Sequence, residues 1–540
     1  MSQRPEVSAY DEKAEVNHVE TRDGAVDGVI IQKATEYSDT QLKSELDTFG
    51  LWQSIKVFKR IILICFAAGL CAALDGYQHQ MIASIVANKG FIRQFAEGGT
   101  KLDPKHVSTF GGVYSAGMVL GQFCVQWPLE WLGRRGGVWV CCVILALAAM
   151  TECLSKVWWN WTIARLIAGI GVGAIQVNLP VYINEMAAVQ IRGIVVVAYS
   201  FWFAFGQFFA SIALYSRNKT HPYDWRVMIY TQFAMIGLMA GIFIILPESP
   251  WWLVRKNKLD QAKKVLTWNY KGVPGFDADR EISIIAATIE QQKRWELEAK
   301  AQGPFAILQG LNLKRFLIGC YPKVLQQFAG LALFTSYATY FFQLAGNKDP
   351  FNVTLILTCV GWASVLLDAA LVDVIGRRRM TIIGFGGACT GVLIMAIIGC
   401  FQYDNAKLGA VLVFGGVFAN FCNQLQASTS YAYLTEMPEL RFKARATGWG
   451  LAFCNIWAIL INFCLPLMIQ KWQVKAAWFF VCLGIPGTVL AYFIMPESMG
   501  RSSAEIHELF VDRVNLRKWK GHKTNIERDL DARMGHAQGI

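Results

Sequence analysis

The chain has 540 residues, of which 54% are hydrophobic and 17% are charged, and its formal net charge is +12. Soluble globular chains carry roughly 25% charged residues, so this composition excludes an ordinary soluble protein of this size. The basic residues lie in short loops between apolar runs, a pattern typical of membrane topology rather than of a nucleic-acid-binding surface.

The first segment of the chain is polar and acidic. Residues 1–50 hold eleven acidic and five basic residues and almost no apolar cluster. This composition predicts a disordered cytosolic tail over residues 1–59, without a signal peptide. Lys56, Lys59 and Arg60 then mark the inner edge of the first apolar run.

Twelve long apolar runs follow the tail. Lipid offers the backbone no hydrogen-bond partners, so runs of about 20 apolar residues must be membrane-spanning helices. The predicted spans are 61–83, 109–132, 137–155, 161–184, 193–216, 226–246, 316–341, 353–373, 380–401, 408–434, 446–470 and 476–495. Because their number is even, both tails lie on the same side of the membrane.

The spans divide the chain into two six-helix halves, residues 60–247 and 316–495. Between them, residues 248–315 are charged and show helical patterning, which predicts a small set of amphipathic helices rather than a slack linker. Residues 496–540 form a short second tail. The predicted fold class is therefore an all-α membrane protein with a helical linker on the side of the tails.

Loop charge gives the orientation of the predicted spans. Loops on the tail side carry more lysine and arginine than the opposite loops, which places both tails and the linker in the cytosol. The three Asn-x-Ser/Thr triplets, at Asn160, Asn218 and Asn352, all fall in predicted outer loops, in agreement with this orientation.

Three motifs occur twice, once in each half and in the same order. They follow the second and eighth, the fourth and tenth, and the sixth and twelfth spans. In sequence they are Glu130–Arg135 and Asp373–Arg378, Tyr182–Glu185 and Tyr433–Glu436, and Pro247–Ser249 and Pro496–Ser498. The distance from Gly133 to Pro247 is 114 residues and that from Gly376 to Pro496 is 120. This repetition indicates duplicated halves that meet at a central site.

These motifs resemble those of the sugar porter family of the major facilitator superfamily, and the length and tails are most similar to fungal members. The resemblance covers roughly residues 60–510. It is carried by the two acid-x-x-Gly-Arg-Arg loops, Arg165-x-x-x-Gly-x-Gly-x-Gly173, Pro247-Glu-Ser-Pro-Trp-Trp-Leu253, Gln326-Gln-Phe-Ala-Gly330 and Pro496-Glu-Ser-Met-Gly-Arg-Ser502. It implies a major facilitator fold of twelve helices in two pseudo-symmetric halves.

The charged loop residues predict a cytosolic gate made of ion pairs. Single exposed pairs contribute only about 0–1 kcal/mol, but a network can bias a two-state rocking equilibrium. The alternative is that the arginines only set the topology, which leaves the spaced acids unexplained. The predicted gate residues are Glu130, Arg134, Arg135, Glu185, Arg192, Glu248, Asp373, Arg377, Glu436 and Glu497.

Charges inside the spans predict a proton-coupling site, because a charge within the membrane needs a partner or water. The resemblance implies an acid in the first span that pairs with Arg165, but the usual position holds Gln78. Asp75 lies three residues earlier on the same helical face. We therefore predict that Asp75, helped by His79, pairs with Arg165 and carries the proton; the alternative is facilitative transport. Lys323 and Asp368 also lie near spans, without an assigned role.

A sugar site needs amide side chains for hydroxyl groups and an aromatic surface for the ring. The double glutamine matches the family's ligand-binding position, and other polar and aromatic side chains of the second half could line the site. The predicted substrate-binding residues are Gln326, Gln327, Tyr337, Asn423, Tyr431, Asn455 and Trp457. Ala332, Ser200 and Gly361 stand where the family has amides, so a standard glucose site is not implied.

We predict a secondary active transporter that takes up a mono- or disaccharide across the plasma membrane by proton symport. The alternatives are a transporter-like nutrient sensor and a transporter of a non-sugar polyhydroxylated metabolite. No enzyme constellation or Walker-type loop occurs, and the 14 cysteines lie in or beside apolar segments without metal-type spacing. We expect no cofactor, metal or nucleic acid; the partners are the solute, the proton and the bilayer. The oligomeric state is open, and a monomer is compatible with this prediction.

Overall fold

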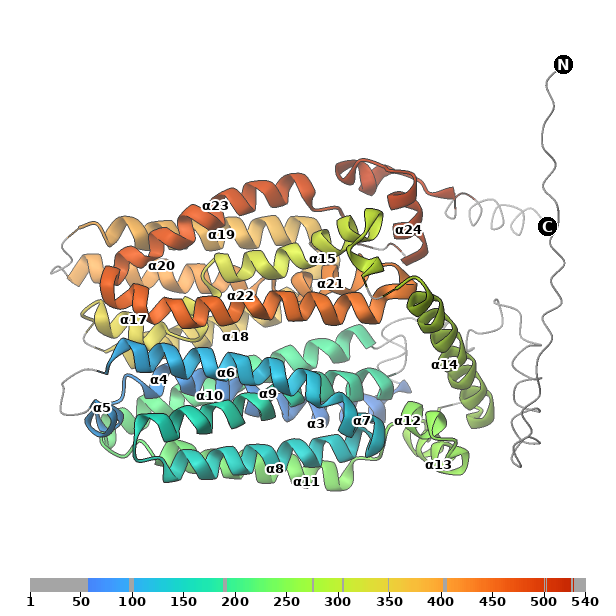
Figure 1. Cartoon of the computed structure of the whole chain (residues 1–540), viewed down its shortest axis with the longest axis horizontal. Coiled ribbons are helices and arrows are strands. Elements are labelled where there is room, and N and C mark those ends of the chain that lie inside the picture. Colours follow the sequence, from blue (N-terminus) through green and yellow to red (C-terminus); the bar gives the residue numbers. More distant parts are fainter. Residues whose placement is uncertain are drawn as a thin grey trace, which may run out of the picture.

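The computed structural model describes residues 57–96, 102–187, 192–273, 276–303, 305–347, 349–401, 406–499, 501, 503–525 and 528. Within these residues, each predicted span is one helix or a short series of helices, and no strand occurs. Figure 1 shows two bundles of roughly parallel helices side by side, one from each half of the sequence. The predicted all-α major facilitator fold is confirmed. Residues 1–56 of the predicted tail (1–59) lie outside the described residues, and its last residue, Lys59, begins the first described helix.

The first bundle contains the helices of the N-terminal half. The first span is broken at Cys71, and α7 continues the second span. In chain order the helices are α3 (Lys59–Leu70), α4 (Ala72–Ile85), α5 (Lys89–Phe95), α6 (Pro104–Cys124), α7 (Gln126–Trp131), α8 (Gly133–Leu154), α9 (Trp158–Met186), α10 (Arg192–Thr220) and α11 (Val227–Ile245).

The second bundle contains the helices of the C-terminal half, and two of its spans are interrupted. The seventh span is divided into α15 (Gly310–Phe328), α16 (Leu331–Thr335) and α17 (Ala338–Leu344), and the tenth into α20 (Ala406–Gln424) and α21 (Ala427–Glu436). The unbroken spans are α18 (Pro350–Ile375), α19 (Arg377–Ile398), α22 (Lys443–Trp472) and α23 (Ala477–Ile494).

Linker and tail helices gather at one end of both bundles. The linker forms α12 (Pro250–Arg255), α13 (Leu259–Asn269) and α14 (Ala278–Ala301), and α24 (Ser503–Val511) follows the last span (Figure 1). Arg441 lies 3.4 Å from Glu298, so α14 contacts the second bundle. We call this end of the molecule the linker end and the opposite end the far end.

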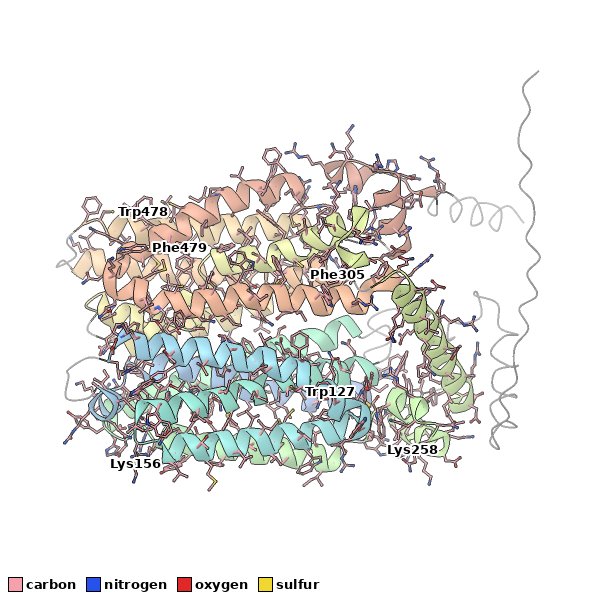
Figure 2. All side chains as sticks on the ribbon, in the orientation of Figure 1. Trp127, Lys156, Lys258, Phe305, Trp478 and Phe479 are labelled. Atoms are coloured by element: carbon pink, nitrogen blue, oxygen red, sulfur yellow. The ribbon has the colours of Figure 1, made fainter. Side chains whose placement is uncertain are left out.

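The lateral surface has the features of a membrane protein. By length and hydropathy alone, eight segments of the described residues are apolar enough to cross a membrane, and the last of them contains both α22 and α23. The segments that fail this test are α6, α10 and the broken seventh span. Exposed aromatic side chains lie near both ends, as at membrane–water interfaces. Figure 2 labels Trp127 and Phe305 near the linker end and Trp478 near the far end.

Close glycine contacts hold α9 against α6. A Cβ atom on Gly169 would meet the carbonyl oxygen of Tyr114, and one on Gly173 would meet that of Met118. Small residues allow the backbones of membrane helices to approach in this way. The glycine motif of the fourth span therefore lets α9 pack closely against α6, and this packing positions the polar side chains of α9.

The break in the tenth span is held by Asp368 of α18. Its carboxylate accepts hydrogen bonds from the backbone nitrogen of Ser428 at 3.0 Å and from the Ser428 hydroxyl at 2.8 Å. These groups belong to the first turn of α21, where backbone N–H groups lack helical partners. Asp368 thus has a structural role that the sequence did not reveal.

We expect Asp368→Ala to destabilise the protein by about 1–3 kcal/mol, because a buried N–H group loses its acceptor. Thermal unfolding of the purified protein in detergent measures this effect. Asp368→Asn is the matched control, since its amide oxygen can still accept from Ser428. Equal stability of Asp368→Ala and wild type would contradict the proposed capping role.

Candidate functional site

A chain of hydrogen bonds crosses between the two halves near the middle of the bundles. The Asn455 side chain of α22 donates to Gln122 of α6 at 2.7 Å. Gln122 donates to Gln176 of α9 at 3.1 Å, and Gln176 donates to Asp75 of α4 at 3.2 Å. Each amide thus donates to the next group in the series, and the last one donates to the carboxylate. We call this series the amide chain.

The Asp75 carboxylate at the end of the amide chain is fully buried. Its second oxygen accepts from the Tyr199 hydroxyl of α10 at 2.8 Å, and His79 Nδ1 lies 4.0 Å from its first oxygen. His79 keeps 19% of its side chain exposed and packs edge-on against Tyr114 and Phe203. The imidazole is thus the partly accessible neighbour of the buried acid, which fits the predicted association of Asp75 with His79.

Arg165 does not contact Asp75, so the predicted Asp75–Arg165 pair is wrong. Arg165 forms an ion pair with Glu152 of α8 at 3.1 Å, and both side chains are fully buried. Gln78 accepts from Arg165 at 3.4 Å and Gln232 donates to Glu152 at 3.3 Å.

Arg165 pairs with Glu152 and not with Asp75 because Asp75 lies on a different side of α4 and at a different height along it. Gln78 is the α4 residue that faces Arg165, whereas a shift of three residues rotates Asp75 about 60° away at roughly 100° per residue. Asp75 instead meets Gln176, eleven residues beyond Arg165 on α9. Glu152 takes the place of the expected partner, and the sequence analysis missed it because it lies near the end of a predicted span.

The predicted substrate glutamines lie on the last turn of α15. Gln326 is buried and its side-chain oxygen accepts from Lys323 Nζ at 3.0 Å. Gln327 is also largely buried. The Lys323 ammonium lies 4.1 Å from the ring centre of Tyr431 on α21, a residue that is 50% exposed. Gln326, Lys323 and Tyr431 thus form one group in the second half.

The remaining predicted substrate residues are spread over the second half. Asn455 begins the amide chain, and Trp457 packs against Phe328 with ring centres 5.2 Å apart. Asn423 is fully buried, and neither its amide oxygen nor its nitrogen has a hydrogen-bond partner within the described residues.

Tyr337 belongs to the closed far end rather than to the polar groups at the centre. It is almost fully buried, donates to the Asn462 carbonyl at 3.0 Å, and its hydroxyl occupies the space beside Gly111 of α6. Ser84 and Thr339 also join the two halves there, with hydroxyl oxygens 3.0 Å apart. Asn462 donates to Ser115 across the same interface at 3.0 Å.

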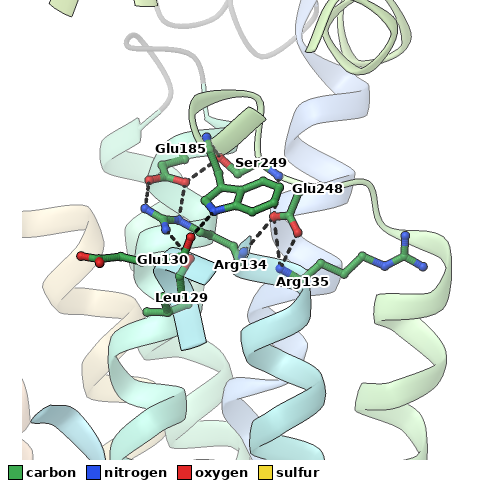
Figure 3. Close-up of polar contacts among 8 residues, drawn as sticks. Leu129, Glu130, Arg134, Arg135, Glu185, Glu248 and Ser249 are labelled. Atoms are coloured by element: carbon green, nitrogen blue, oxygen red, sulfur yellow. Dashed lines mark hydrogen bonds and ion pairs between the residues drawn. The ribbon is translucent and has the colours of Figure 1, made fainter. Parts of the chain in front are cut away.

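A second polar group closes the linker end of the first half (Figure 3). Arg134 binds both carboxylate oxygens of Glu185, at 2.9 and 2.7 Å, and donates to the Leu129 carbonyl. Glu248 accepts from the backbone nitrogens of Arg134 at 2.9 Å and Arg135 at 3.2 Å. The Ser249 hydroxyl donates to Glu185 at 2.5 Å. We call this group the first brace.

The second half repeats these contacts. Glu497 accepts from the backbone nitrogens of Arg377 at 2.9 Å and Arg378 at 3.2 Å. Arg377 lies 3.8 Å from Glu436, to which the Ser498 hydroxyl donates at 2.6 Å. This second brace shows that the duplicated motifs perform duplicated packing.

Both braces join helices within one half, whereas the predicted gate residues were expected to pair as the cytosolic ends close. Glu130 is exposed and contributes only its backbone carbonyl, to Trp252, so its predicted ion pair is absent within the described residues. Arg135 donates to the carbonyls of Phe243 and Ile244. The side chains of Arg192 and Asp373 lie outside the described residues. Burial raises the pKa of Glu248 above its ordinary value, and the backbone N–H groups that Glu248 binds offset part of this rise.

Sequence comparison gives the chain a family. Residues 26–510 match the family model described as "Sugar (and other) transporter". The galactose transporter of Saccharomyces cerevisiae is 24% identical over 90% of this chain and 89% of that protein. The major facilitator-type transporter ecdD of Aspergillus rugulosus is 27% identical over 85% of this chain and 89% of that protein.

Solved structures share the fold. The inward open conformation of the xylose transporter XylE from E. coli has a TM-score of 0.67 and 20% identity, covering 83% of this chain and 99% of that chain. The proton:xylose symporter XylE bound to 6-bromo-6-deoxy-D-glucose has a TM-score of 0.63 and 19% identity, with coverage of 84% and 99%. At this identity the likeness supports the arrangement of helices alone.

We expect Glu152→Gln to destabilise the protein by about 3–5 kcal/mol, because Arg165 becomes an uncompensated buried charge. Arg165→Gln should have a similar effect. The double variant Glu152→Gln with Arg165→Gln should cost less than the sum of the two single changes, since it leaves no unpaired charge. Thermal unfolding of the three purified variants measures this coupling, and additive losses would contradict the pair.

Gly133→Ala should weaken the first brace. Gly133 has φ of +88°, and a Cβ atom there would meet the Glu248 carboxylate. We expect a loss of at least about 1–2 kcal/mol from the backbone conformation alone. Gly386→Ala is the matched control, because this helical glycine has open space around it. The control should be neutral or stabilising by about 0.5–1 kcal/mol in the same thermal unfolding assay.

Proposed function

The chain belongs to the sugar transporter family of the major facilitator superfamily, and we propose that it takes up a sugar by alternating access driven by proton symport. The multi-pass architecture provides two bundles that can rock about a central site. The single observation that carries the proposal is the amide chain, which joins a buried acid of the first half to the second half. The cargoes named for similar proteins, galactose and xylose, favour a sugar.

The contacts between the halves favour a state that is closed at the far end. Tyr337, Thr339 and Asn462 meet first-half residues there. Loop charge and the position of the linker support a cytosolic linker end, so the far end would face outward. We propose that these contacts break when the transporter opens to the outside of the plasma membrane, with both tails in the cytosol.

Asp75 is the proposed proton carrier, in preference to the second buried acid, Glu152. Glu152 is committed to Arg165, and protonating it would leave the arginine without its counter-charge. Asp75 has neutral hydrogen-bond donors and the partly exposed His79 as neighbours. Protonation of Asp75 adds an O–H donor where Gln176 and Tyr199 now donate, which changes the polarity of the amide chain.

The braces are proposed to keep each half rigid during rocking. Each ties the start of one span to the ends of two others by charge-assisted hydrogen bonds, within one half. A rigid half moves as one body, so the rearrangement is confined to the interface between the halves.

Expression in a yeast strain without its own sugar transporters tests the proposed function. We expect uptake of at least one labelled hexose, pentose or disaccharide, accumulated above equilibrium and reduced to equilibration by a proton uncoupler. Absence of uptake of any of these sugars by correctly localised protein would refute the proposal.

Asp75→Asn should abolish accumulation while sugar exchange across the membrane continues, because an amide cannot carry the proton. Proteoliposomes containing the purified variant measure both, with and without an imposed pH gradient. Asp349→Asn is the matched control, since this acid precedes α18 in a loop and its side chain makes no capping bond. Unchanged proton-driven accumulation by Asp75→Asn would exclude Asp75 as the carrier.

A further inference from the structure

Lys323 is a cation deep within a membrane-spanning helix. It is the fourteenth residue of α15, about 20 Å from the linker end of that helix at a rise of about 1.5 Å per residue. Its side chain is partly exposed. A lysine at this depth is costly and is retained where it pairs with another group or lines a solute pathway.

Lys323 has no carboxylate partner within the described residues. Its ammonium group contacts the Gln326 side-chain oxygen at 3.0 Å and the face of Tyr431 at 4.1 Å. An amide oxygen and an aromatic face stabilise the cation without neutralising it. The positive charge is therefore available to a ligand.

The bond between Lys323 and Gln326 also fixes the direction of the amide. An ammonium group can only donate, so Gln326 must turn its oxygen toward Lys323 and its NH2 group away. Lys323 retains further N–H groups that do not bind Gln326. The two side chains together present donors, which match a group that only accepts hydrogen bonds, such as a carboxylate.

These donors lie close to the contact between the two halves. The Lys323 ammonium contacts Tyr431 on α21, and Cys454 on α22 contacts the Cys320 carbonyl of α15 at 3.9 Å. The next residue of α22, Asn455, donates to Gln122 of the first half at 2.7 Å. Asp75, the buried acid at the other end of the amide chain, has its two oxygens bound by Gln176 and Tyr199 of the first half. The donors of Lys323 and Gln326 thus lie at the interface where a solute would meet both halves.

We propose that the central site takes a sugar that carries a carboxylate, such as a uronic or aldonic acid, and that Lys323 binds this carboxylate. The proposal rests on the proposed sugar transport and specifies its substrate class. Gln326 donates to the same carboxylate or to the adjacent hydroxyl, and Tyr431 covers the ring of the sugar. A neutral sugar offers no negative charge to Lys323 and binds more weakly.

Matched pairs of neutral and acidic sugars test this inference on the full-length protein in proteoliposomes. The pairs are glucose with glucuronate and galactose with galacturonate, and the methyl ester of glucuronate has nearly the same shape without the charge. We expect the acids to bind about 10- to 100-fold more tightly than the neutral sugars and the ester, the range for one hydrogen-bonded charge. Competition with labelled solute gives these ratios for the wild type without any variant.

Two variants assign the preference to Lys323. Lys323→Gln should bring the ratio of acid to neutral affinity close to one, while Lys323→Arg should keep a preference for the acid. Thermal unfolding checks that both variants fold. Equal loss of affinity for acidic and neutral sugars in Lys323→Gln, or a change in proton dependence alone, would overturn the role of Lys323.

The outcomes separate this inference from the proposed function. Uptake of glucose or galactose with no preference for the acids overturns the inference and leaves sugar transport intact. Failure of every neutral and acidic probe to bind or be transported overturns both. Tight binding of the acids that vanishes in Lys323→Gln supports both.

Discussion

Two carboxylates, Glu248 and Glu497, each accept backbone hydrogen bonds from the first turn of a helix that begins more than 110 residues earlier. A helix start leaves N–H groups without partners and carries partial positive charge, so an acid there is doubly favourable. Gly133 and Gly376 adopt positive φ and leave room for the acids. These contacts tie the end of the last span of each half to the start of its third, and the packing of each six-helix unit depends on that closure.

The buried charged side chains of these two units divide into two groups, those paired with an opposite charge and those bound only by neutral groups. Glu152 and Arg165 neutralise each other inside the first half, and Gln78 and Gln232 add one hydrogen bond each to the pair, from Arg165 to Gln78 and from Gln232 to Glu152. Because separating a buried ion pair leaves uncompensated charges, we expect this pair to stay formed during transport. Asp75 of the first half and Lys323 of the second half are instead bound by neutral partners, each from its own half. In the proposed mechanism, Asp75 takes up the proton and Lys323 binds the solute.

Hydropathy and repeated motifs predicted the helices and located the braces, because span length and loop charge are set locally along the chain. They could not predict the direction in which a polar side chain points within a span. Asp75 and Gln78 differ by less than one helical turn, yet they contact different residues of α9. Glu152 was overlooked because depth alone does not distinguish an interfacial acid from one that neutralises Arg165. The break before α21 also depends on Asp368, a distant residue whose role only the packing reveals.

The amide chain has a thermodynamic consequence for the whole transporter. Its first bond, from Asn455 to Gln122, spans the interface between the halves, whereas its last bond ends on a titratable group. Linkage requires that any free energy by which the ionisation of Asp75 alters the association of the halves acts equally in reverse. If Asp75 has the proposed role, separation of the halves changes its proton affinity by the same factor. In the proposed mechanism, a few hydrogen bonds between neutral amides make rocking and proton binding one equilibrium.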